Sequence, residues 1–297
     1  MKSMKKALKK GDNPLYGIAL MLSAMLAFSA MDVISKRLAV EYSPIEIAFA
    51  RYAVLALAMV PYIVRSRGAV LRTARPGLQC LRGFFMAATT ACFVFGLASL
   101  PLADTTAIGF ASPLLATVLS ALILKERIGF GQWAAVGLGF LGILVAVRPG
   151  AASFDPAALM PLAAALFWAS GLVVSRVMKE SEPPLTTLAY TALAGSAVLL
   201  LPVVLVWTTP VPVALGLALV TGLVTTFGHW ALILSVQYAP PSVVAPFVYS
   251  QIIWATLFGA FFFGVLPDAA TGIGAAIVVA CGLYTIQRER DQASAPA

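Results

Sequence analysis

The stretch that decides the fold is residues 16–36, which read YGIALMLSAMLAFSAMDVISK. It carries no charge before Asp32, and it is long enough to cross a bilayer, since a transmembrane helix needs roughly 20 apolar residues. A Lys-rich segment before it and Ala27-Phe28-Ser29-Ala30 within it imitate a secretory signal with its cleavage site. We interpret the stretch as a transmembrane helix instead, because of its length and because the second half of the chain contains a counterpart.

That counterpart is residues 155–176, which read DPAALMPLAAALFWASGLVVSR. Leu26-Ala27-Phe28-Ser29-Ala30 aligns with Leu166-Phe167-Trp168-Ala169-Ser170, and Ser35-Lys36 aligns with Ser175-Arg176. The match continues in order, with one residue of drift, at Ser43-Pro44 with Glu182-Pro183, Gly83 with Gly222, Pro101 with Pro240 and Ala116-Thr117 with Ala255-Thr256. Shared composition would explain any single match, but five spans in register indicate an internal repeat.

The composition excludes a soluble protein. Of the 297 residues, 61% are hydrophobic and 11% are charged, whereas a typical soluble domain has about 25% charged residues. The apolar sequence suffices for about ten spans of roughly 20 residues. They are helices, because backbone polar groups in hydrocarbon need partners within the segment and barrel strands would alternate in polarity. We place them at residues 16–36, 43–64, 79–99, 103–124, 130–147, 155–176, 185–207, 212–237, 241–263 and 268–287.

The odd number of spans in each repeat fixes how the two halves are related. Because an odd number of crossings ends on the other side of the membrane, the second repeat inserts upside down relative to the first. The predicted fold is an all-α integral membrane protein, with ten transmembrane helices arranged as two inverted five-helix repeats. Its parts are a basic tail over residues 1–15, the repeats over 16–148 and 155–287, and a C-terminal tail over 288–297.

Basic residues predict the orientation in the membrane. Sixteen of the 20 lysines and arginines lie on the side of the N-terminus, three lie on the other side, and Arg51 lies within a span. By the positive-inside rule, both termini are cytoplasmic and the loops near residues 40, 101, 150, 210 and 267 are external. The formal charge of +8 therefore reports topology, and we expect no nucleic-acid partner. The expected location is the inner membrane of a bacterium.

The sequence contains few residues of the types that could bind a metal or form a disulfide. Cys80, Cys92 and Cys281 lie far apart and show neither metal-ligand spacing nor the density of a disulfide scaffold. An intramembrane enzyme needs a positioned base, nucleophile or metal, and the single histidine and scattered acidic residues assemble none. We therefore expect no metal, no cofactor and no enzymatic activity.

One stretch has the features of a known family. It runs from Ala111-Ser112-Pro113-Leu114-Leu115 through Lys125-Glu126-Arg127 to Gly137, Gly139 and Gly142. It resembles the Pro-containing fourth helix, closing Glu and Gly-rich fifth helix of the EamA-type branch of the drug/metabolite transporter superfamily. The second half departs from this pattern, since Val265 stands where the first half has Glu126. The resemblance implies a basket of helices one, three, four, six, eight and nine around a cavity, with helices five and ten outside.

The fourth and ninth spans correspond in the repeat, and both contain helix-breaking residues. The first break is around Phe110, Ser112 and Pro113, and the second runs from Pro246 through Tyr249, Ser250 and Gln251. Proline inside a helix removes a hydrogen bond and bends the axis. Paired interruptions of this kind point to the substrate site of a transporter, although kinks that serve only packing are also common. We predict that these residues line the site.

Aromatic and polar residues in spans six, eight and nine extend this candidate site. Trp168, His229, Trp230 and Trp254 lie well inside their spans, whereas aromatic residues that only anchor a helix lie near its ends. Their large apolar bodies with one polar group suit a cavity for an apolar side chain. Packing against lipid or other helices is the competing explanation for each of them. The aromatic interior resembles that of bacterial exporters of amino acids within the family.

Charged residues inside spans are functional candidates by default. Asp32 and His229 are possible proton or charge sites, although Asp32 lies four residues before Lys36 and a pair between them would be structural. Arg51 is expected to pair with Glu46 or to extend its side chain outward. Spans seven to nine contain no Lys or Arg, which argues against a phosphorylated substrate, because such a substrate would need deep cations in both halves.

The sequence thus predicts a transporter that exports small metabolites by alternating access, with amino acids bearing apolar or aromatic side chains as the favoured substrates. A proton-coupled multidrug or metabolite exporter is the alternative, and a membrane scaffold would not need broken helices. The expected partners are a small-molecule substrate and the lipid bilayer. The oligomeric state is left open, and a monomer is compatible with the sequence.

Overall fold

The computed structural model describes residues 13–125, 128–148, 155–178, 182–239 and 241–294. Within these ranges the chain is helical, without strands, and ten of its helical segments are long and apolar enough to cross a membrane. The prediction of an all-α protein with ten spans is confirmed. Glu126, Arg127 and the loop near residue 150 lie outside the described residues, as do residues 1–12 of the basic tail and residues 295–297.

Most spans are single helices, and two are divided. In the first half the helices are α1 (Pro14–Leu38), α2 (Pro44–Arg65), η2 (Ala69–Leu71), α3 (Pro76–Ser99), α4 (Leu102–Gly109), α5 (Ser112–Ile123) and α6 (Phe130–Val147). In the second half they are η3 (Pro156–Ala158), α7 (Leu159–Met178), α8 (Pro184–Val206), α9 (Pro212–Tyr238), α10 (Pro241–Val244), η4 (Ala245–Tyr249), α11 (Ser250–Phe263) and α12 (Ala269–Ser294). The fourth span is α4 with α5, and the ninth is η4 with α11.

Local sequence signals explain where the helices begin. Proline occupies an early position of α1, α2, α3, α8 and α9, where its missing N–H is not needed for helical hydrogen bonds. At α2 the Ser43 N–H donates to the Glu46 carboxylate at 2.8 Å and the Ile45 N–H donates to Ser43 Oγ at 3.3 Å. This capping box holds Glu46 at the helix terminus, so the expected pair of Glu46 with Arg51 is wrong.

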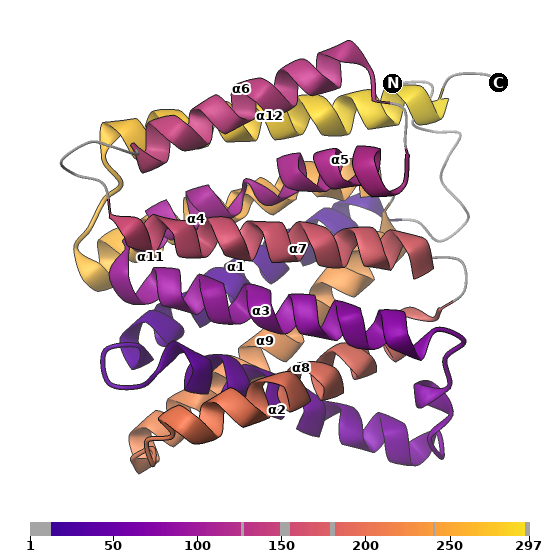
Figure 1. Ribbon diagram of the computed structural model, residues 1–297, viewed down its shortest axis with the longest axis vertical. Coiled ribbons are helices and arrows are strands. Elements are labelled where there is room, and N and C mark those ends of the chain that lie inside the picture. Colours follow the sequence, from indigo (N-terminus) through magenta and orange to yellow (C-terminus); the bar gives the residue numbers. More distant parts are fainter. Residues whose placement is uncertain (1–12, 126–127, 149–154, 179–181, 240, 295–297) are drawn as a thin grey trace.

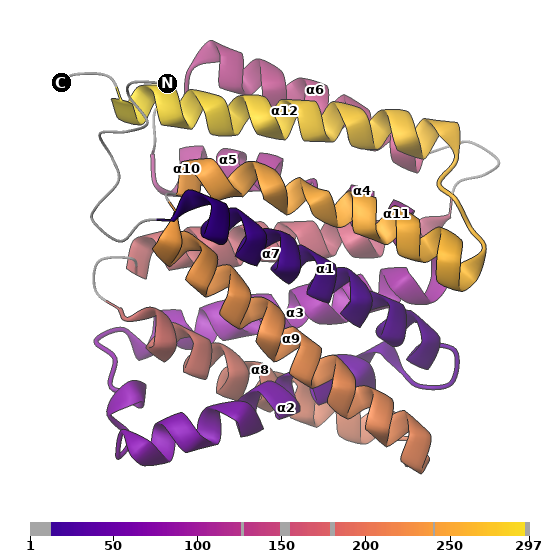
Figure 2. The same ribbon diagram turned by 180° about the vertical axis from the view of Figure 1, so that it is seen from behind.

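Helices that correspond in the two repeats pack in matching ways. α1 packs on α9 as α3 packs on α7, and α1 packs on α11 as α7 packs on α5. α6 and α12 lie together along one edge of the bundle, and α2 and α8 lie together along the opposite edge (Figures 1 and 2). The position of α6 and α12 agrees with the arrangement that the family resemblance implies. α1 begins and α12 ends at the same end of the bundle, which we call the terminal end (right in Figure 1).

Glycines bring α6 and α12 into backbone contact, which gives a prediction about stability. A Cβ atom at Gly274 would lie 2.5 Å from the Gly142 carbonyl oxygen and 2.8 Å from Ala146 Cβ, whereas nothing lies within 4 Å of one at Gly272. Overpacking of this kind costs about 1–3 kcal/mol. We expect Gly274→Val to lower the thermal unfolding temperature in detergent and Gly272→Val on the same helix to leave it almost unchanged. Equal effects would contradict this account of the contact.

Candidate functional site

A buried ion pair joins the first two helices. Arg51 Nη2 lies 3.1 Å from Asp32 Oδ1, and the two side chains are 5% and 3% exposed. The Arg51 guanidinium also donates from Nε to Ser35 Oγ at 3.2 Å, and from Nη2 to the same oxygen. Ser35 donates its own proton to the Met31 carbonyl, and the Gln251 side chain adds a hydrogen bond to Asp32. The network connects α1, α2 and α11.

This pairing corrects two expectations from the sequence. Asp32 does not pair with Lys36, because Lys36 Nζ donates instead to the Leu97 and Leu100 carbonyls at 2.7 and 2.6 Å. Those carbonyls end α3, where the helix dipole favours a cation. Arg51 does not extend outward either, since it is buried against Asp32. The charge of Asp32 is therefore neutralised by Arg51 of the neighbouring helix α2 and not by a residue of α1.

A second arginine lies inside the helical bundle, although its position suggests a loop cation. Arg82 is about two turns into α3, because that helix begins at Pro76. Its Nε donates to Ser175 Oγ on α7 at 2.6 Å, and its Nη1 donates to Thr191 Oγ1 on α8. The sixteen basic residues that the sequence assigns to the side of the N-terminus include Arg82, and the structure places Arg82 inside α3 instead. The predicted span 79–99 already contains this position.

Tyr52 and His229 lie near both arginines. Tyr52 Oη is 3.2 Å from Thr90 Oγ1 on α3, and it interacts electrostatically with both Arg51 and Arg82. His229 is also near enough to both arginines for such an interaction. We call Asp32, Arg51, Tyr52, Arg82 and His229 the interior charge cluster. Sequence reasoning proposed Asp32 and His229 and missed Tyr52, whose hydroxyl gives no pattern in an apolar span.

His229 is held in place by its own helix and by α1. Its Nδ1 lies 2.9 Å from the Thr225 carbonyl oxygen, and its ring meets the Phe28 ring at a centroid distance of 5.2 Å and an angle of 73°. Phe28 also packs against Gly228, where a Cβ atom would lie 2.6 Å from the ring. The histidine thus stands where α1 and α9 meet, with an apolar ring beside the charged groups.

The two divided spans bring a different pair of predicted residues together. α4 ends at Gly109 and α5 starts at Ser112 with Pro113 in its first turn, while Pro246 lies in η4 just before Ser250 opens α11. The Phe110 and Tyr249 rings meet across the breaks at 5.0 Å. Both are buried with residues of α6 and α12, and a Cβ at Gly282 would lie 1.6 Å from Tyr249 Oη. They face α12 and not the interior charge cluster.

The predicted tryptophans lie in three different environments. Trp168 is 36% exposed and precedes Leu172 by one turn on α7. Trp230 is 51% exposed and forms an outer stripe on α9 with Phe227 and Leu223. Trp254 packs against a buried cluster to which α1, α9 and α10 contribute, and its buried Nε1 has no hydrogen-bond partner among the described residues. The structure therefore does not gather the predicted aromatic residues into one site.

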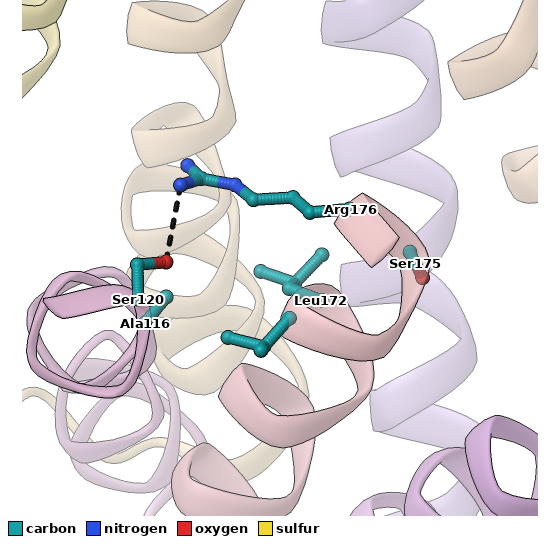
Figure 3. A pocket seen from close by; sticks show the side chains of 6 residues that line it. Ala116, Ser120, Leu172, Ser175 and Arg176 are labelled. Atoms are coloured by element: carbon teal, nitrogen blue, oxygen red, sulfur yellow. Dashed lines mark hydrogen bonds between the residues drawn. The ribbon is translucent and has the colours of Figure 1, made fainter. Parts of the chain in front are cut away.

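A cavity of about 320 Å³ lies between α5 and α7 (Figure 3). Leu172, Val173, Ser175 and Arg176 line it from α7, and Ala116 and Ser120 line it from α5. Arg176 Nη1 crosses it to donate to Ser120 Oγ at 3.1 Å. Ser175 is also the residue that accepts from Arg82. Figure 3 shows the Ser175 hydroxyl on the side of α7 that faces away from Ser120, so Arg82 and the cavity lie on different sides of this helix.

The end of the bundle opposite the terminal end has its own ion pair. Arg148 pairs with Asp268, and the Thr271 N–H donates to Asp268 Oδ1 at 2.8 Å. The Thr271 N–H and then the Arg148 guanidinium hold the pKa of Asp268 below its ordinary value. The pair joins the end of α6 to the start of α12. Within the described ranges, no three His, Cys, Asp or Glu side chains are grouped as metal ligands would be.

Several curated proteins resemble this chain along nearly their whole length. The S-adenosylmethionine uptake transporter of Rickettsia prowazekii is 29% identical over 94% of this chain and 95% of its own. The riboflavin transporter of Vibrio cholerae is 30% identical over 93% of this chain and 95% of its own. The pseudopaline exporter of Pseudomonas aeruginosa is 29% identical over 89% and 94%. One solved crystal structure covers 93% of this chain with a TM-score of 0.63 and 20% identity, which shows a shared fold.

The family comparison agrees with these relatives. The EamA-like transporter family matches the chain twice, over residues 15–148 and 155–286. Together with the ten apolar helices, the matches show a multi-pass bacterial membrane transporter and not an enzyme. The chain belongs to the EamA-like transporter family.

Proposed function

We propose that the protein carries an amphipathic metabolite of the amino-acid class, with an ammonium and carboxylate headgroup and an apolar or aromatic remainder. The observation that supports this is the interior charge cluster, which has one carboxylate and two guanidinium groups inside the bundle. Charged groups at membrane depth are costly and usually serve a substrate or ion. Asp32 would bind the ammonium, and an arginine would bind the carboxylate by charge-assisted hydrogen bonds.

Two aromatic side chains, one beside the cluster and one near the cavity, suit the rest of such a substrate. Phe28 lies against His229, and Trp168 is partly exposed one turn from the cavity residue Leu172. The names of the relatives support a site for planar rings, since S-adenosylmethionine has an adenine ring on an amino acid and riboflavin has a flavin ring. The relatives are named for both uptake and export, so the proposal concerns the substrate, and export stays a prediction.

Counterflow in proteoliposomes tests the proposal. Vesicles preloaded with unlabelled tryptophan should accumulate labelled tryptophan and phenylalanine faster than labelled alanine, because more apolar surface is buried with a large side chain. Vesicles with the protein but without the preload provide the control. Exchange of riboflavin without any amino acid would overturn the proposed headgroup. The proton-coupled alternative is tested by removing the pH gradient. Net flux would then collapse if transport is coupled to protons.

The orientation in the membrane is a further proposal, with both termini in the cytoplasm of a bacterial cell. Its support is the excess of basic residues at the terminal end. In a variant with Cys80, Cys92 and Cys281 replaced by Ser, a cysteine at the exposed position Thr209 should react with an impermeant maleimide in intact cells. One at the exposed position Arg72 should react only after permeabilisation. The reverse pattern would show the opposite orientation.

A further inference from the structure

Two neighbouring cations in the last turn of α1 bind other helices at the end of the bundle opposite the terminal end, which we call the far end. Lys36 Nζ donates to the Leu97 and Leu100 carbonyls at 2.7 and 2.6 Å, where α3 ends. Arg37 Nη2 donates to the Phe262 carbonyl at 2.9 Å, in the last turn of α11. The last carbonyls of a helix have no partner within it, and the helix dipole favours a cation beside them.

The two cations differ in which helices they join. α1 packs on α9 and on α11, and α3 packs on α7. Arg37 therefore binds a helix that already packs on α1. α1 has much less contact with α3 than with α9 or α11. The contact of Lys36 with α3 thus joins the α1–α9 pair to the α3–α7 pair.

Lys36 also lies between Asp32 and the far end. It follows Asp32 by one turn on the same face of α1, and Asp32 is the residue proposed to bind the ammonium of the substrate. Asp104 in the first turn of α4 is near enough to Lys36 for an electrostatic interaction. The Phe263 ring of α11 lies 5.6 Å from Lys36 Nζ. Groups from α3, α4 and α11 therefore meet at this ammonium.

The corresponding position in the second repeat has different surroundings. Ser35-Lys36 aligns with Ser175-Arg176, and Arg176 lies two residues before α7 ends, in the half of the bundle near the terminal end. Arg176 lines the cavity of about 320 Å³ and reaches across it to Ser120 of α5 (Figure 3). The position equivalent to Lys36 thus borders open space near the terminal end, whereas Lys36 itself is bound to the end of α3.

We infer that Lys36 is the gate at the far end. Its ammonium holds α1 and α3 together and closes the route from Asp32 to that side of the membrane. Opening that side requires both hydrogen bonds to the α3 carbonyls to break, so that the α1–α9 and α3–α7 pairs can separate there. On the proposed orientation this side is external. The inference rests on the proposed function for the place of the site at Asp32, and on the contacts of Lys36 for the closure.

Two reporter cysteines test the gate in the variant whose native cysteines are replaced by Ser. Ser29 lies two turns before Lys36 on the same face of α1 and is 1% exposed, so Ser29→Cys reports access from the far end. Leu172 is 36% exposed and lines the cavity near the terminal end, so Leu172→Cys reports access from there. A small impermeant methanethiosulfonate labels the first in intact cells and the second in inverted membrane vesicles.

Lys36→Met keeps the length of the side chain and removes the ammonium. We expect it to make labelling of Ser29→Cys about tenfold faster and labelling of Leu172→Cys several times slower, because one side of an alternating-access transporter closes as the other opens. Lys36→Arg can still donate to both carbonyls and should restore both rates. Arg37→Met is the matched control, and it should leave both rates almost unchanged, because α11 packs on α1 without this contact.

Three results would overturn the inference. Faster labelling of both reporters in Lys36→Met would show a loosened bundle, and unchanged labelling would show that the contact does not keep the far end closed. Equal effects of Lys36→Met and Arg37→Met would show that any cation of the last turn suffices.

The labelling also separates this inference from the proposed function, because it needs no substrate. If no amino acid is exchanged but the two reporters respond to Lys36→Met in opposite directions, the proposed substrate is wrong and the gate stands. If tryptophan is exchanged but labelling does not respond to Lys36→Met, the gate is wrong and the proposed function stands.

Discussion

Replacing Arg51 by Met is expected to lower the free energy of unfolding by about 3–5 kcal/mol, because the change leaves Asp32 as an uncompensated buried charge. Replacing both partners, as Asp32→Leu with Arg51→Met, removes the charge together with its need for a partner and should recover most of that loss. Denaturant titration in mixed micelles measures both variants. A double variant as unstable as the single one would contradict the pairing of Asp32 with Arg51.

Transport by the double variant distinguishes a structural pair from a functional one. On the proposed function, the double variant should reach the membrane in normal amounts and still lose tryptophan exchange, because the ammonium has lost its partner. The same reasoning predicts that Asp32→Asn loses most activity. A pair with Lys36 would have predicted substantial activity for that variant, but Lys36 donates to the Leu97 and Leu100 carbonyls instead.

Trp168→Ala is expected to raise the apparent transport constant for tryptophan about tenfold, which corresponds to roughly 1.4 kcal/mol. Removing the ring exposes apolar surface of the substrate to water, which costs about 25 cal/mol per Å². It also removes a contact between rings that is worth roughly 0.5–1.5 kcal/mol. Alanine has little surface to lose, so its constant should change little. Proteoliposome uptake of both substrates at equal protein content provides the measurement.

Trp230 provides a matched control for Trp168. Its ring is 51% exposed on the outer stripe of α9 with Phe227, so Trp230→Ala should change neither transport constant by more than about twofold, or roughly 0.4 kcal/mol. If Trp168→Ala weakened tryptophan and alanine equally, Trp168 would support the helix bundle and would not contact the substrate. If Trp230→Ala strongly raised the transport constant for tryptophan alone, Trp230 would instead contact the substrate.

The spans and their ends follow from local features that the sequence displays directly. Runs of apolar residues between prolines and charges give the helices, and Pro44, Pro76, Pro184 and Pro212 lie at or near their starts. The repeat is visible because both halves keep the order of their small and helix-breaking residues. These signals are local features of the sequence, so they can be interpreted without knowing how the helices pack against each other.

The partners of the buried charges depend on packing between helices, and the sequence shows this poorly. The spacing of Asp32 and Lys36 fits a pair on one helix, yet α2 places Arg51 closer to the carboxylate. Tyr249 is predicted to line the site, but its helix turns the ring toward Gly282. In a membrane protein both the interior and the lipid-facing surfaces are apolar, so a span rarely has the polar face that would show its rotation.

The close packing of α1 on α9 determines which parts can move together. A Cβ atom at Gly17 would lie 2.6 Å from Ala239 Cβ, and Phe28 fills the space at Gly228 further along. α3 and α7 are joined in the same way, where Met86 fills the space at Gly171 and Pro161 the space at Gly96. Each of these tightly packed pairs takes one helix from each half of the sequence. If the protein alternates access, we expect each of these mixed pairs to move as one unit, and we expect the hinge to lie elsewhere than at the boundary between the repeats.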